Sequence, residues 1–400
     1  MLSAESATTV RATLPVIGAS LDAITDRFYS TMFAERPDLL DGLFNRGNQA
    51  SGEQRRALAA SIAGFATALL ANPQERPDAL LSRIAHKHTA VGVTDDQYII
   101  VHKYLFGAIA DVLGDAVTPE VAAAWDDVYW LMAGALIARE ARIYAEAGAA
   151  DGRTWRPWTV VRCTEETPDV VSYTLRPVGD APIPVARPGQ YVSVRVPLAD
   201  GTRQLRQYSL SGGVGAGLRR ITVKRVRGGS DGATPPGEVS NLLHDTVREG
   251  DELTLSAPFG DLRLEDGDGP VVLASAGIGC TPITAMLHHL AETGSQRRLL
   301  LLHADRSERT HALRGEAEEL VGRLPGAERV FFYEDGSGGA AARAGRMDLD
   351  GVDVPSDATV YLCGPLPFMR EVRGGFLRAG VPASAVCYEV FGPDLWLGAD

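Results

Sequence analysis

The stretch Leu80-Leu81-Ser82-Arg83-Ile84-Ala85-His86-Lys87-His88-Thr89 has the spacing of an amphipathic helix and carries two of the eight histidines of the chain. Residues three and four positions apart share one face of a helix. His88 therefore lies on the apolar side, together with Leu81, Ile84 and Ala85. The spacing predicts a helix with one histidine that points inward.

The other histidine, His86, shares its face with Ser82 and Arg83 and is predicted to point toward solvent. Two positions correspond to about 200° of rotation at 3.6 residues per turn, so the two imidazoles cannot bind one small site. An inward histidine is either a hydrogen-bonded core residue or a ligand. This stretch alone favours the core residue.

The residues around this stretch, 1–149, are predicted to be helical throughout. Apolar residues recur at three- and four-residue steps, and capping residues open helices at Ser3, Ser51, Thr94 and Thr118. No alternation of apolar and polar residues occurs here. The first part of the chain is therefore predicted to be an all-α domain.

Downstream of this domain the pattern changes twice. Residues 153–266 contain short alternating runs between Gly- and Pro-rich turns, with one helical insert at Val239 to Val247, which predicts an antiparallel β-barrel. Residues 269–400 alternate helices with short apolar strands such as Val271 to Ser275, which is typical of an α/β domain with a parallel sheet. The predicted fold is multidomain: all-α, then β-barrel, then α/β.

The composition excludes several classes of protein. A formal net charge of −12 argues against a nucleic-acid-binding surface. The four cysteines are scattered without CxxC spacing, which predicts a reducing, cytoplasmic location and neither a disulfide frame nor a zinc site. We expect no signal peptide and no stable membrane association, because the nearest apolar window, Trp130 to Ala138, ends at Arg139.

A phosphate-binding turn is predicted where the first strand of the α/β domain ends. Gly277-Ile278-Gly279-Cys280-Thr281-Pro282 opens a helix there, and backbone N–H groups at a helix start favour a pyrophosphate. Taken alone, the turn is equally consistent with an ordinary tight connection between a strand and a helix.

Five further motifs accompany this turn in a fixed order. They are Pro188-Gly-Gln-Tyr191, Arg206-Gln207-Tyr208-Ser209, Glu238-Val-Ser240-Asn241, Cys363-Gly-Pro365 and Glu389-Val390-Phe391-Gly392-Pro393. In this order and spacing, the set resembles the ferredoxin-reductase type of FAD and NAD(P)H module.

The resemblance implies that the Arg206–Ser209 motif binds FAD. Tyr208 would lie against the isoalloxazine and Arg206 at the pyrophosphate, while Tyr191 and Ser240 would add further flavin contacts.

The resemblance also implies a nucleotide site in the third domain. The turn Gly277–Pro282 would hold the pyrophosphate of NAD(P)H, although Cys280 stands where many members of this class carry glutamine. Phe391 would lie by the flavin ring, and Glu389 would tune the flavin potential. Cys363 is either a buried strand residue or a neighbour of the nicotinamide.

The helical domain resembles a globin, and the whole chain resembles flavohaemoglobin. The matching residues are Phe28-Tyr29-x-x-Met32-Phe33, Leu43-Phe44-Asn45, Gln54-Arg55-x-x-Leu58, Lys87-His88-Thr89, Gln97-Tyr98 and Arg139-Glu140-x-x-Ile143-Tyr144. This resemblance makes His88 the proximal ligand of the iron of haem b.

On the distal side, the resemblance places the Tyr29 hydroxyl where it can donate to bound oxygen. Phe44 would pack on the porphyrin edge, and Leu58 would line the distal pocket. Gln54 either reaches this pocket or completes the capping box that begins at Ser51.

On the proximal side, Tyr98 and Glu140 would form a hydrogen-bond relay with His88. A carboxylate that polarises the imidazole makes it a stronger electron donor to iron, which favours oxygen activation over oxygen storage. Lys87 either tunes the potentials of haem and flavin or is simply solvated.

These residues predict a nitric oxide dioxygenase, in which NAD(P)H reduces FAD, FAD reduces haem, and oxy-haem converts nitric oxide to nitrate. The alternatives are an oxygen sensor or carrier, and a general NAD(P)H-dependent reductase. The expected partners are small molecules, and a monomer is expected. The sequence does not decide whether the protein prefers NADH or NADPH; Arg306 and Arg309 are the candidates for a clamp on the 2′-phosphate of NADPH. It assigns no role to Asp394–Asp400.

Overall fold

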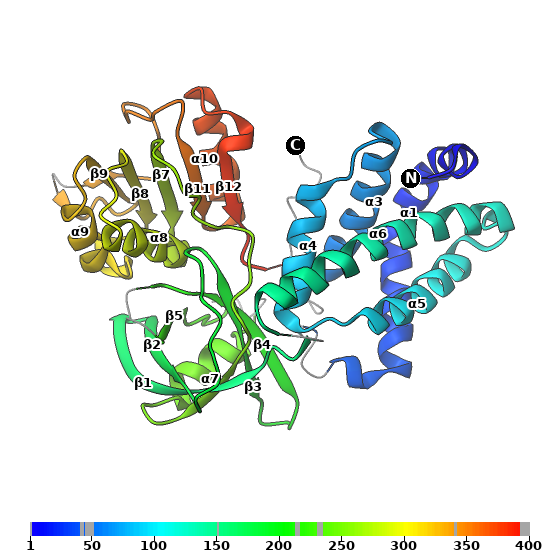
Figure 1. Cartoon of the computed structure of the whole chain (residues 1–400), viewed down its shortest axis with the longest axis horizontal. Helices are drawn as coiled ribbons and strands as arrows, with labels where there is room; N and C mark the ends of the chain where they lie inside the picture. Colours follow the sequence, from blue (N-terminus) through cyan, green and yellow to red (C-terminus); the bar gives the residue numbers. More distant parts are fainter. Residues whose placement is uncertain are drawn as a thin grey trace. The chain divides into compact units, whose positions relative to one another are not determined.

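The computed structural model describes residues 2–40, 44, 52–149, 152–212, 217–229, 235–339 and 342–392 (Figure 1). These residues form two compact units. The first contains residues up to Trp155 together with Arg195–Arg206 and Gly392, and the second contains Arg156–Val194 and Gln207–Phe391. Several positions used in the sequence analysis lie outside the described residues: Leu43, Asn45, Ser51, Pro393 and the tail Asp394–Asp400.

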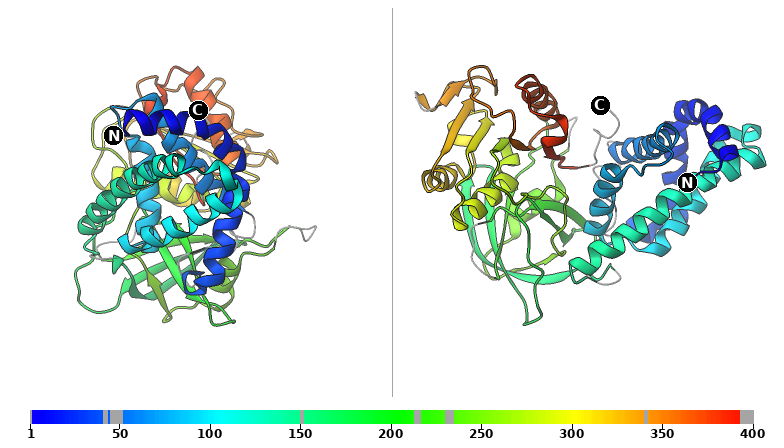
Figure 2. Two further views of the ribbon diagram at one scale, coloured as in Figure 1. Left: turned by 90° about the vertical axis from the view of Figure 1, so that its right-hand side faces the viewer. Right: turned by 45° about the horizontal axis from the view of Figure 1, so that its top comes forward.

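The first unit is helical, as predicted (Figure 2). Its elements are α1 (Ala4–Glu35), η1 (Pro37–Leu40), α3 (Glu53–Ala71), α4 (Asp78–Val91), α5 (Asp95–Leu113), η2 (Gly114–Ala116) and α6 (Pro119–Glu146). Helix α1 packs against α3, α5 and α6, and α6 also packs against α4. The long α1 therefore forms one wall of the helical core.

Three of the four predicted helix starts are confirmed. The Ser3 side chain accepts a hydrogen bond from the N–H of Ser6 at 3.0 Å. Thr94 and Gln97 form the predicted capping box of α5, and Thr118 caps α6 with Pro119 in its first turn. These caps succeed as predictions because each depends on only four consecutive residues.

The prediction that His86 faces solvent is wrong, because its exposed fraction is only 6%. The buried residues of α4 are Leu81, Ala85, His86, Thr89 and Ala90. At about 100° per residue, these positions span an arc of about 180°, which is wider than the stripe defined by the leucine and isoleucine residues. His88 lies at the edge of this arc and is half-buried rather than enclosed.

The expectation that no segment reaches the apolar length of a membrane span is also wrong. Helix α6 contains an 18-residue window with a mean hydropathy of 1.3 and at most two charged residues. The sequence prediction relied on an uninterrupted apolar run and therefore missed a longer window, 121–138, that contains Asp126 and Asp127 and ends before Arg139. By length and composition alone, α6 could cross a membrane.

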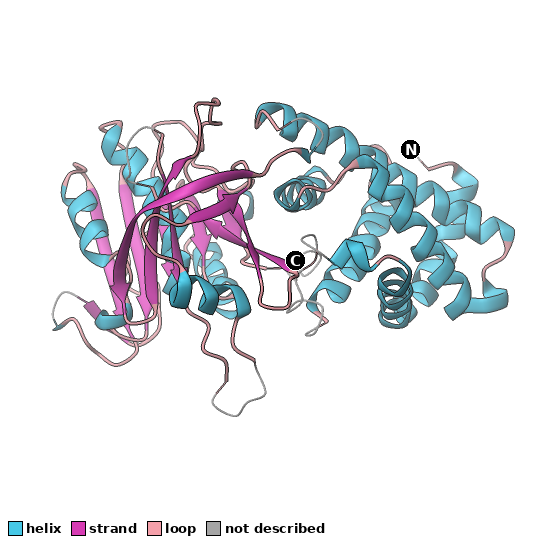
Figure 3. Ribbon diagram, turned by 90° about the horizontal axis from the view of Figure 1, so that it is seen from below, coloured by secondary structure: helices cyan, strands magenta, loops and turns pink. Residues whose placement is uncertain are grey.

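The antiparallel strands predicted for the β-barrel are confirmed, and they form one six-stranded sheet (Figure 3). Its strands are β1 (Arg156–Thr167), β2 (Val170–Pro177), β3 (Tyr191–Pro197), β4 (Arg203–Ser209), β5 (Arg219–Lys224) and β6 (Glu252–Leu255), and the helix is α7 (Glu238–Thr246). The strand order is β4-β3-β6-β1-β2-β5. The Arg206–Ser209 motif thus forms the end of the edge strand β4.

The parallel sheet is confirmed as well. Its elements are β7 (Val271–Ala276), η4 (Gly277–Gly279), α8 (Cys280–Glu292), β8 (Leu299–Asp305), η5 (Glu308–Thr310), α9 (Arg314–Gly322), β9 (Ala327–Tyr333), β10 (Ala342–Ala344), β11 (Thr359–Cys363), α10 (Leu366–Arg378), η7 (Ala383–Ala385) and β12 (Val386–Glu389). The order is β10-β9-β8-β7-β11-β12, and neighbouring strands run parallel. The sequence did not predict β10, which is short and has no apolar run.

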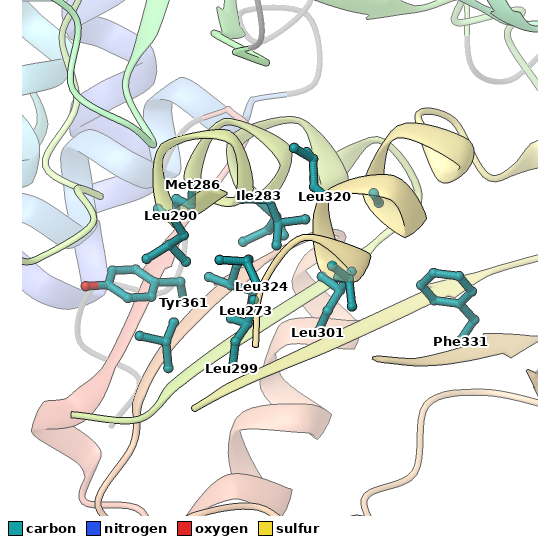
Figure 4. Close-up of a cluster of buried hydrophobic side chains, with 14 of the residues drawn as sticks. Leu273, Ile283, Met286, Leu290, Leu299, Leu301, Leu320, Leu324, Phe331 and Tyr361 are labelled. Carbon is teal, nitrogen blue, oxygen red and sulfur yellow. The ribbon is translucent and has the colours of Figure 1, made fainter. Parts of the chain in front are cut away.

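Alternate strand residues supply the core of this sheet. Leu273, Leu299, Leu301 and Phe331 point toward α8 and α9, where they meet side chains such as Ile283 (Figure 4). Helix α10 lies on the opposite face of the strands (Figure 4). Because both faces are covered, the strands read as nearly continuous apolar runs. The predicted limits of the three domains stay predictions, and the elements of each type fall inside them.

Candidate functional site

One hydrogen-bonded cluster joins three helices. It contains His88 of α4, Tyr98 of α5 and Glu140 of α6. The His88 Nδ1 atom lies 2.8 Å from Glu140 Oε1 and 2.9 Å from the Tyr98 hydroxyl. The Tyr98 hydroxyl donates to the same Glu140 oxygen at 2.6 Å. Glu140 and Tyr98 are both buried. The structure therefore brings together the three residues that the sequence predicted as a proximal relay.

The chemistry of these contacts indicates which nitrogen carries the proton in a neutral imidazole. An ionised carboxylate only accepts hydrogen bonds, so its contact with Nδ1 places the ring proton on that nitrogen. Burial, and next the charge of Glu140, raise the pKa of Tyr98, so the phenol keeps its proton and remains a donor. In the neutral ring with its proton on Nδ1, the Nε2 atom of His88 has a lone pair, which is the form that binds a metal.

A further residue of this site, Tyr129, was missed by the sequence analysis. Its hydroxyl donates to the main-chain carbonyl of Tyr98 at 2.5 Å and so fixes the first turns of α5 against α6. Tyr129 precedes Glu140 by 11 positions, which is about three helical turns. This shared face was the signal available in the sequence.

Tyr29 lies in an aromatic cluster formed by residues that the sequence predicts on the distal side of the haem site. Its ring stacks on Phe33 with centroids 5.5 Å apart and meets the edge of Phe44 at 6.1 Å. Burial raises the pKa of Tyr29, so its hydroxyl stays protonated and can donate. The Gln54 side chain hydrogen-bonds to Tyr29, and Leu58 follows Gln54 by one turn of α3. The N-cap of α3 is Gly52, whereas the capping-box alternative for Gln54 requires Ser51. The contact with Tyr29 therefore favours the position of Gln54 in the pocket.

Lys87 points in a different direction from His88, as neighbours on a helix must. Its Nζ atom donates to the main-chain carbonyl of Gly392 at 3.1 Å. Within the first unit, this bond ties the C-terminal part of the chain to α4. The predicted influence of Lys87 on redox potentials stays a prediction.

The two serines among the candidate flavin residues differ in their hydrogen bonds. Ser240 Oγ accepts from the N–H of Val226 at 3.1 Å and donates to the carbonyl of Gly237, so it fastens the start of α7 locally. Ser209 Oγ is buried and has no hydrogen-bond partner among the described residues. A buried hydroxyl without a partner is costly, so Ser209 fits a ligand atom at this position.

The remaining candidate flavin residues differ in their exposure. Tyr191 is buried, and its ring lies against Gly260, where a Cβ atom would approach it to 3.0 Å. Glu389 is buried, and the Cys363 thiol donates to its carbonyl at 3.6 Å. Phe391 is 46% exposed, so part of its side chain is accessible to a planar group. The half-buried residues of the set are Arg206, Gln207 and Tyr208, whereas Val390 is buried.

The turn after β7 has the predicted form. Gly277 has a φ of 53°, and Gly279 lies so close to the end of β11 that a Cβ atom would be 2.3 Å from the carbonyl oxygen of Cys363. Ile278 and Gly279 precede α8, which begins with Cys280, Thr281 and Pro282. Burial raises the pKa of the Cys280 thiol to about 12, so Cys280 behaves as an apolar wall residue. The backbone, rather than side chains, forms this cradle.

An acidic residue that the sequence analysis did not single out, Asp305, ends β8. An acid near this position of a nucleotide-binding sheet commonly binds the 2′-hydroxyl of an NAD ribose. Here its carboxylate accepts from the Thr310 hydroxyl at 2.6 Å and from the N–H of Arg306 at 2.7 Å. The side chain is only 6% exposed, whereas Arg306 and Arg309 are exposed.

Charge reversal at these arginines is expected to change nucleotide preference. The double variant Arg306→Glu and Arg309→Glu should raise the KM for NADPH at least about tenfold, because a charged hydrogen bond is worth about 1.5–3 kcal/mol. The KM for NADH should change little. Arg323→Glu, at an exposed position after α9, is the control, and equal changes for both nucleotides would exclude a 2′-phosphate clamp.

The chain matches two family models. The globin model covers residues 26–136, and the oxidoreductase NAD-binding domain model covers residues 273–374. The flavohemoproteins of Bordetella pertussis and Deinococcus radiodurans are 42% and 40% identical to it, each over 98% of this chain and over 99% and 98% of their own lengths. The chain belongs to the flavohaemoglobin family. The predicted resemblance is thereby confirmed, and so is the oxidoreductase class.

Solved structures agree with this assignment. The flavohemoglobin of Malassezia yamatoensis, with bound FAD and heme, has a TM-score of 0.90 and 39% identity over 98% of this chain and all of its own. The FAD/NAD-binding domain of nitric oxide dioxygenase from Vibrio cholerae has a TM-score of 0.56 and 36% identity over 60% of this chain and all of its own. FAD and haem in the first structure agree with the cofactors predicted for this chain.

Proposed function

We propose that the protein is a nitric oxide dioxygenase that uses haem b, FAD and NAD(P)H. When bound, these groups supply hydride acceptance, single-electron transfer and oxygen binding. Two nitric oxide and two dioxygen molecules, with one NAD(P)H, give two nitrate ions, one NAD(P)⁺ and one proton. This activity would remove nitric oxide under nitrosative stress, in the cytoplasm, with the protein as a monomer.

The observation that carries the proposal is the contact of His88 with Glu140. The carboxylate accepts from Nδ1 at 2.8 Å, which gives the imidazole anionic character and makes Nε2 a stronger donor. An oxygen carrier has no need of such a ligand, because it must not activate oxygen. The nitric oxide dioxygenase of V. cholerae, whose FAD/NAD-binding domain resembles this chain, supports the same reaction.

The residues fit the three cofactors on structural grounds. His88 offers Nε2 to iron, Ser209 offers a buried hydroxyl in the flavin motif, and Gly279 offers a close backbone approach beside β11. Tyr29 would orient a donor toward the distal ligand, with Gln54 holding the phenol. The phenol stays protonated and so acts as a donor rather than as a base.

The decisive test is anaerobic reduction by NADH and by NADPH, followed by oxygen and nitric oxide, with nitrate assayed. We expect flavin and haem to be reduced and nitrate to form in a one-to-one ratio with nitric oxide consumed. A purified protein without a Soret band would instead be a plain flavin reductase. A protein whose reduced haem binds oxygen but forms no nitrate would be a carrier or sensor.

Replacement of Glu140 by glutamine tests the proximal relay. This change keeps the size of the side chain and removes its charge, so the haem midpoint potential should rise and nitric oxide consumption should fall about 10- to 100-fold. Flavin reduction by NAD(P)H should stay normal. Glu146→Gln, an exposed change on the same helix, is the control, and an unchanged potential in the Glu140 variant would refute the relay.

A further inference from the structure

The chain segment that follows the candidate flavin motif lies against the helix that opens with the candidate nucleotide turn. A Cβ atom at Gly212, three residues after Ser209, would lie 2.9 Å from the Cα of Ala285 and 3.2 Å from the ring of His288 in α8. These residues belong to one compact unit. No residue larger than glycine fits at this distance from a backbone atom, so the segment is pressed directly onto α8.

A second turn of the antiparallel sheet touches the same helix. A Cβ atom at Gly189, within the Pro188–Tyr191 motif, would lie 2.7 Å from the Cε atom of Met286, the residue that follows Ala285 in α8. Two of the candidate flavin motifs therefore meet neighbouring residues of one helix. Because α8 begins in the turn Gly277–Pro282, this contact sets the flavin motifs against the nucleotide turn.

A polar network fastens this contact on one side. Arg220 of β5 donates from Nε to the Ser211 hydroxyl at 2.9 Å and from Nη2 to the Ser211 carbonyl at 2.9 Å. The same Nη2 atom donates to Glu316 Oε1 of α9 at 2.8 Å. His288 Nε2 contacts this carboxylate oxygen as well. Arg220, Glu316 and His288, the Arg220 bridge, thus link the segment after the flavin motif to both α8 and α9.

The Arg220 bridge is largely shielded from solvent. The side chains of Arg220, Glu316 and His288 are 12%, 24% and 14% exposed. Burial disfavours the charged carboxylate, but the hydrogen bonds from His288 and Arg220 outweigh this effect and lower the pKa of Glu316. The planar guanidinium holds its acceptors in one fixed geometry. Removal of either charge would leave the other poorly solvated and without its partner.

Backbone strain at the start of α9 is a second, independent sign that this contact is enforced. Leu313 has a φ of 59°, the only positive φ outside glycine among the described residues. Its buried side chain packs with Val170 of β2, Cys280 of α8 and Ala312. A left-handed leucine is unfavourable and persists only where its surroundings impose it. The strained residue therefore holds the first turn of α9, which carries Glu316, against the antiparallel sheet.

We propose that Arg220, Glu316 and His288 are positioning residues for hydride transfer from NAD(P)H to FAD. The Arg220 bridge holds the flavin motif against α8 and so fixes how the bound nucleotide meets the flavin. The three side chains exchange neither protons nor electrons with the cofactors; a hydride passes from the reduced nicotinamide to the oxidised flavin. The proposal rests on this step of the proposed function and is independent of the reaction with nitric oxide.

A charge exchange tests the Arg220 bridge. Arg220→Glu and Glu316→Arg should each slow the anaerobic reduction of the flavin by saturating NAD(P)H about 10- to 100-fold, because a displacement of 1 Å at the reacting atoms can cost about 100-fold. The nucleotide concentration at half-saturation should change little, since Gly277–Pro282 is unaltered. The double variant restores opposite charges and should recover most of the lost rate. Native rates in the single variants, or a double variant no faster than they are, would overturn the proposal.

The exposed ion pair of Arg298 and Asp353 provides the matched control. Arg298 Nη2 donates to Asp353 Oδ2 at 2.7 Å, and the two side chains are 44% and 84% exposed. Arg298→Glu and Asp353→Arg make the same changes of charge, and the rate of flavin reduction should stay within about twofold of the native rate, because surface ion pairs contribute little. Losses as large as those of the bridge variants would assign the effect to net charge and overturn the proposal.

Hydrogen exchange of the holoprotein without nucleotide gives a readout that is independent of turnover. The N–H of Ser211 donates to the carbonyl of Arg220 at 2.9 Å, so its exchange reports on the segment that the bridge holds. Arg220→Glu should raise exchange in this segment and in α8, and leave the central strand β8 protected. A uniform increase in all segments would indicate general destabilisation and overturn the positioning role.

A milder variant covers the case in which the charge reversals do not fold. Glu316→Gln keeps the size of the side chain and removes its charge, so it should show the same changes in rate and exchange to a smaller extent. A native rate together with native exchange in this variant would overturn the proposal.

The outcomes separate this proposal from the proposed function. A native protein that NAD(P)H reduces but that forms no nitrate would refute the dioxygenase reaction and leave the results on the Arg220 bridge intact. Nitrate formation by the native protein, with unaltered flavin reduction in the bridge variants, would refute the positioning role alone. A native protein that NAD(P)H does not reduce would refute both.

Discussion

Replacement of His88 by glycine is expected to remove the haem-dependent activity almost completely. Loss of groups that merely support a metal ligand already costs about 10- to 100-fold in affinity or activity, so loss of the ligand itself should cost more. The Soret band of the purified protein should weaken or shift to that of a weakly held haem. Reduction of the flavin by NAD(P)H should continue, because its candidate residues lie in other parts of the chain.

Imidazole rescue makes this expectation specific. The glycine variant leaves a space of the size of the lost ring, bordered by Glu140 and the Tyr98 hydroxyl. Added imidazole should enter it, restore the Soret band and recover part of the nitric oxide consumption. His86→Gln is the control, since it lies two positions away and is buried. Normal haem spectra in the His88 variant, or loss of haem in the His86 variant only, would refute the assignment.

The pair His86 and His88 also shows what the sequence could and could not predict. Helical spacing separated the two histidines, because that property is local to one helix. Burial depends on which neighbouring helices cover α4, and no pattern within ten residues contains that information. A related limit applies to Tyr129: its spacing from Glu140 shows that the two residues share a face of α6, but not that the Tyr129 hydroxyl donates to the main chain of Tyr98.

The fold was predictable to a greater extent than the contacts within the sites. Capping residues, strand alternation and the order of motifs are each set by neighbouring residues, and the two sheets follow from them. Asp305 illustrates the limit in the third domain. Its position at the end of β8 suggests a ribose contact, but its carboxylate already accepts hydrogen bonds from Thr310 and from the N–H of Arg306, which no sequence pattern predicts.

Replacement of Gly279 by alanine is expected to slow the reaction with NAD(P)H strongly. Gly279 has a φ of −61°, which any residue adopts, so the constraint is purely one of space. The added Cβ atom would lie 2.3 Å from the carbonyl oxygen of Cys363 and 2.8 Å from the Cα of Gly364. Both are backbone atoms, so the turn or the end of β11 must move. A displacement of 1 Å in a reacting geometry can cost about 100-fold, and we expect a loss of this order in kcat/KM for flavin reduction.

The neighbouring Gly277 provides a contrast within the same turn. Its φ of 53° favours glycine, yet nothing lies within 4 Å of its Cβ position. Gly277→Ala should therefore cost only the backbone strain of a left-handed residue, about 1–2 kcal/mol, with a smaller kinetic effect. Gly322→Ala on α9, with an open Cβ position and ordinary backbone, is the neutral control. Dithionite should still reduce all variants, because it bypasses the nucleotide. The contrary outcome is a Gly279 variant that NAD(P)H reduces as fast as the native protein. It would show that close packing of the turn against β11 does not position the nucleotide. The side-chain contacts of the turn would then have to position it.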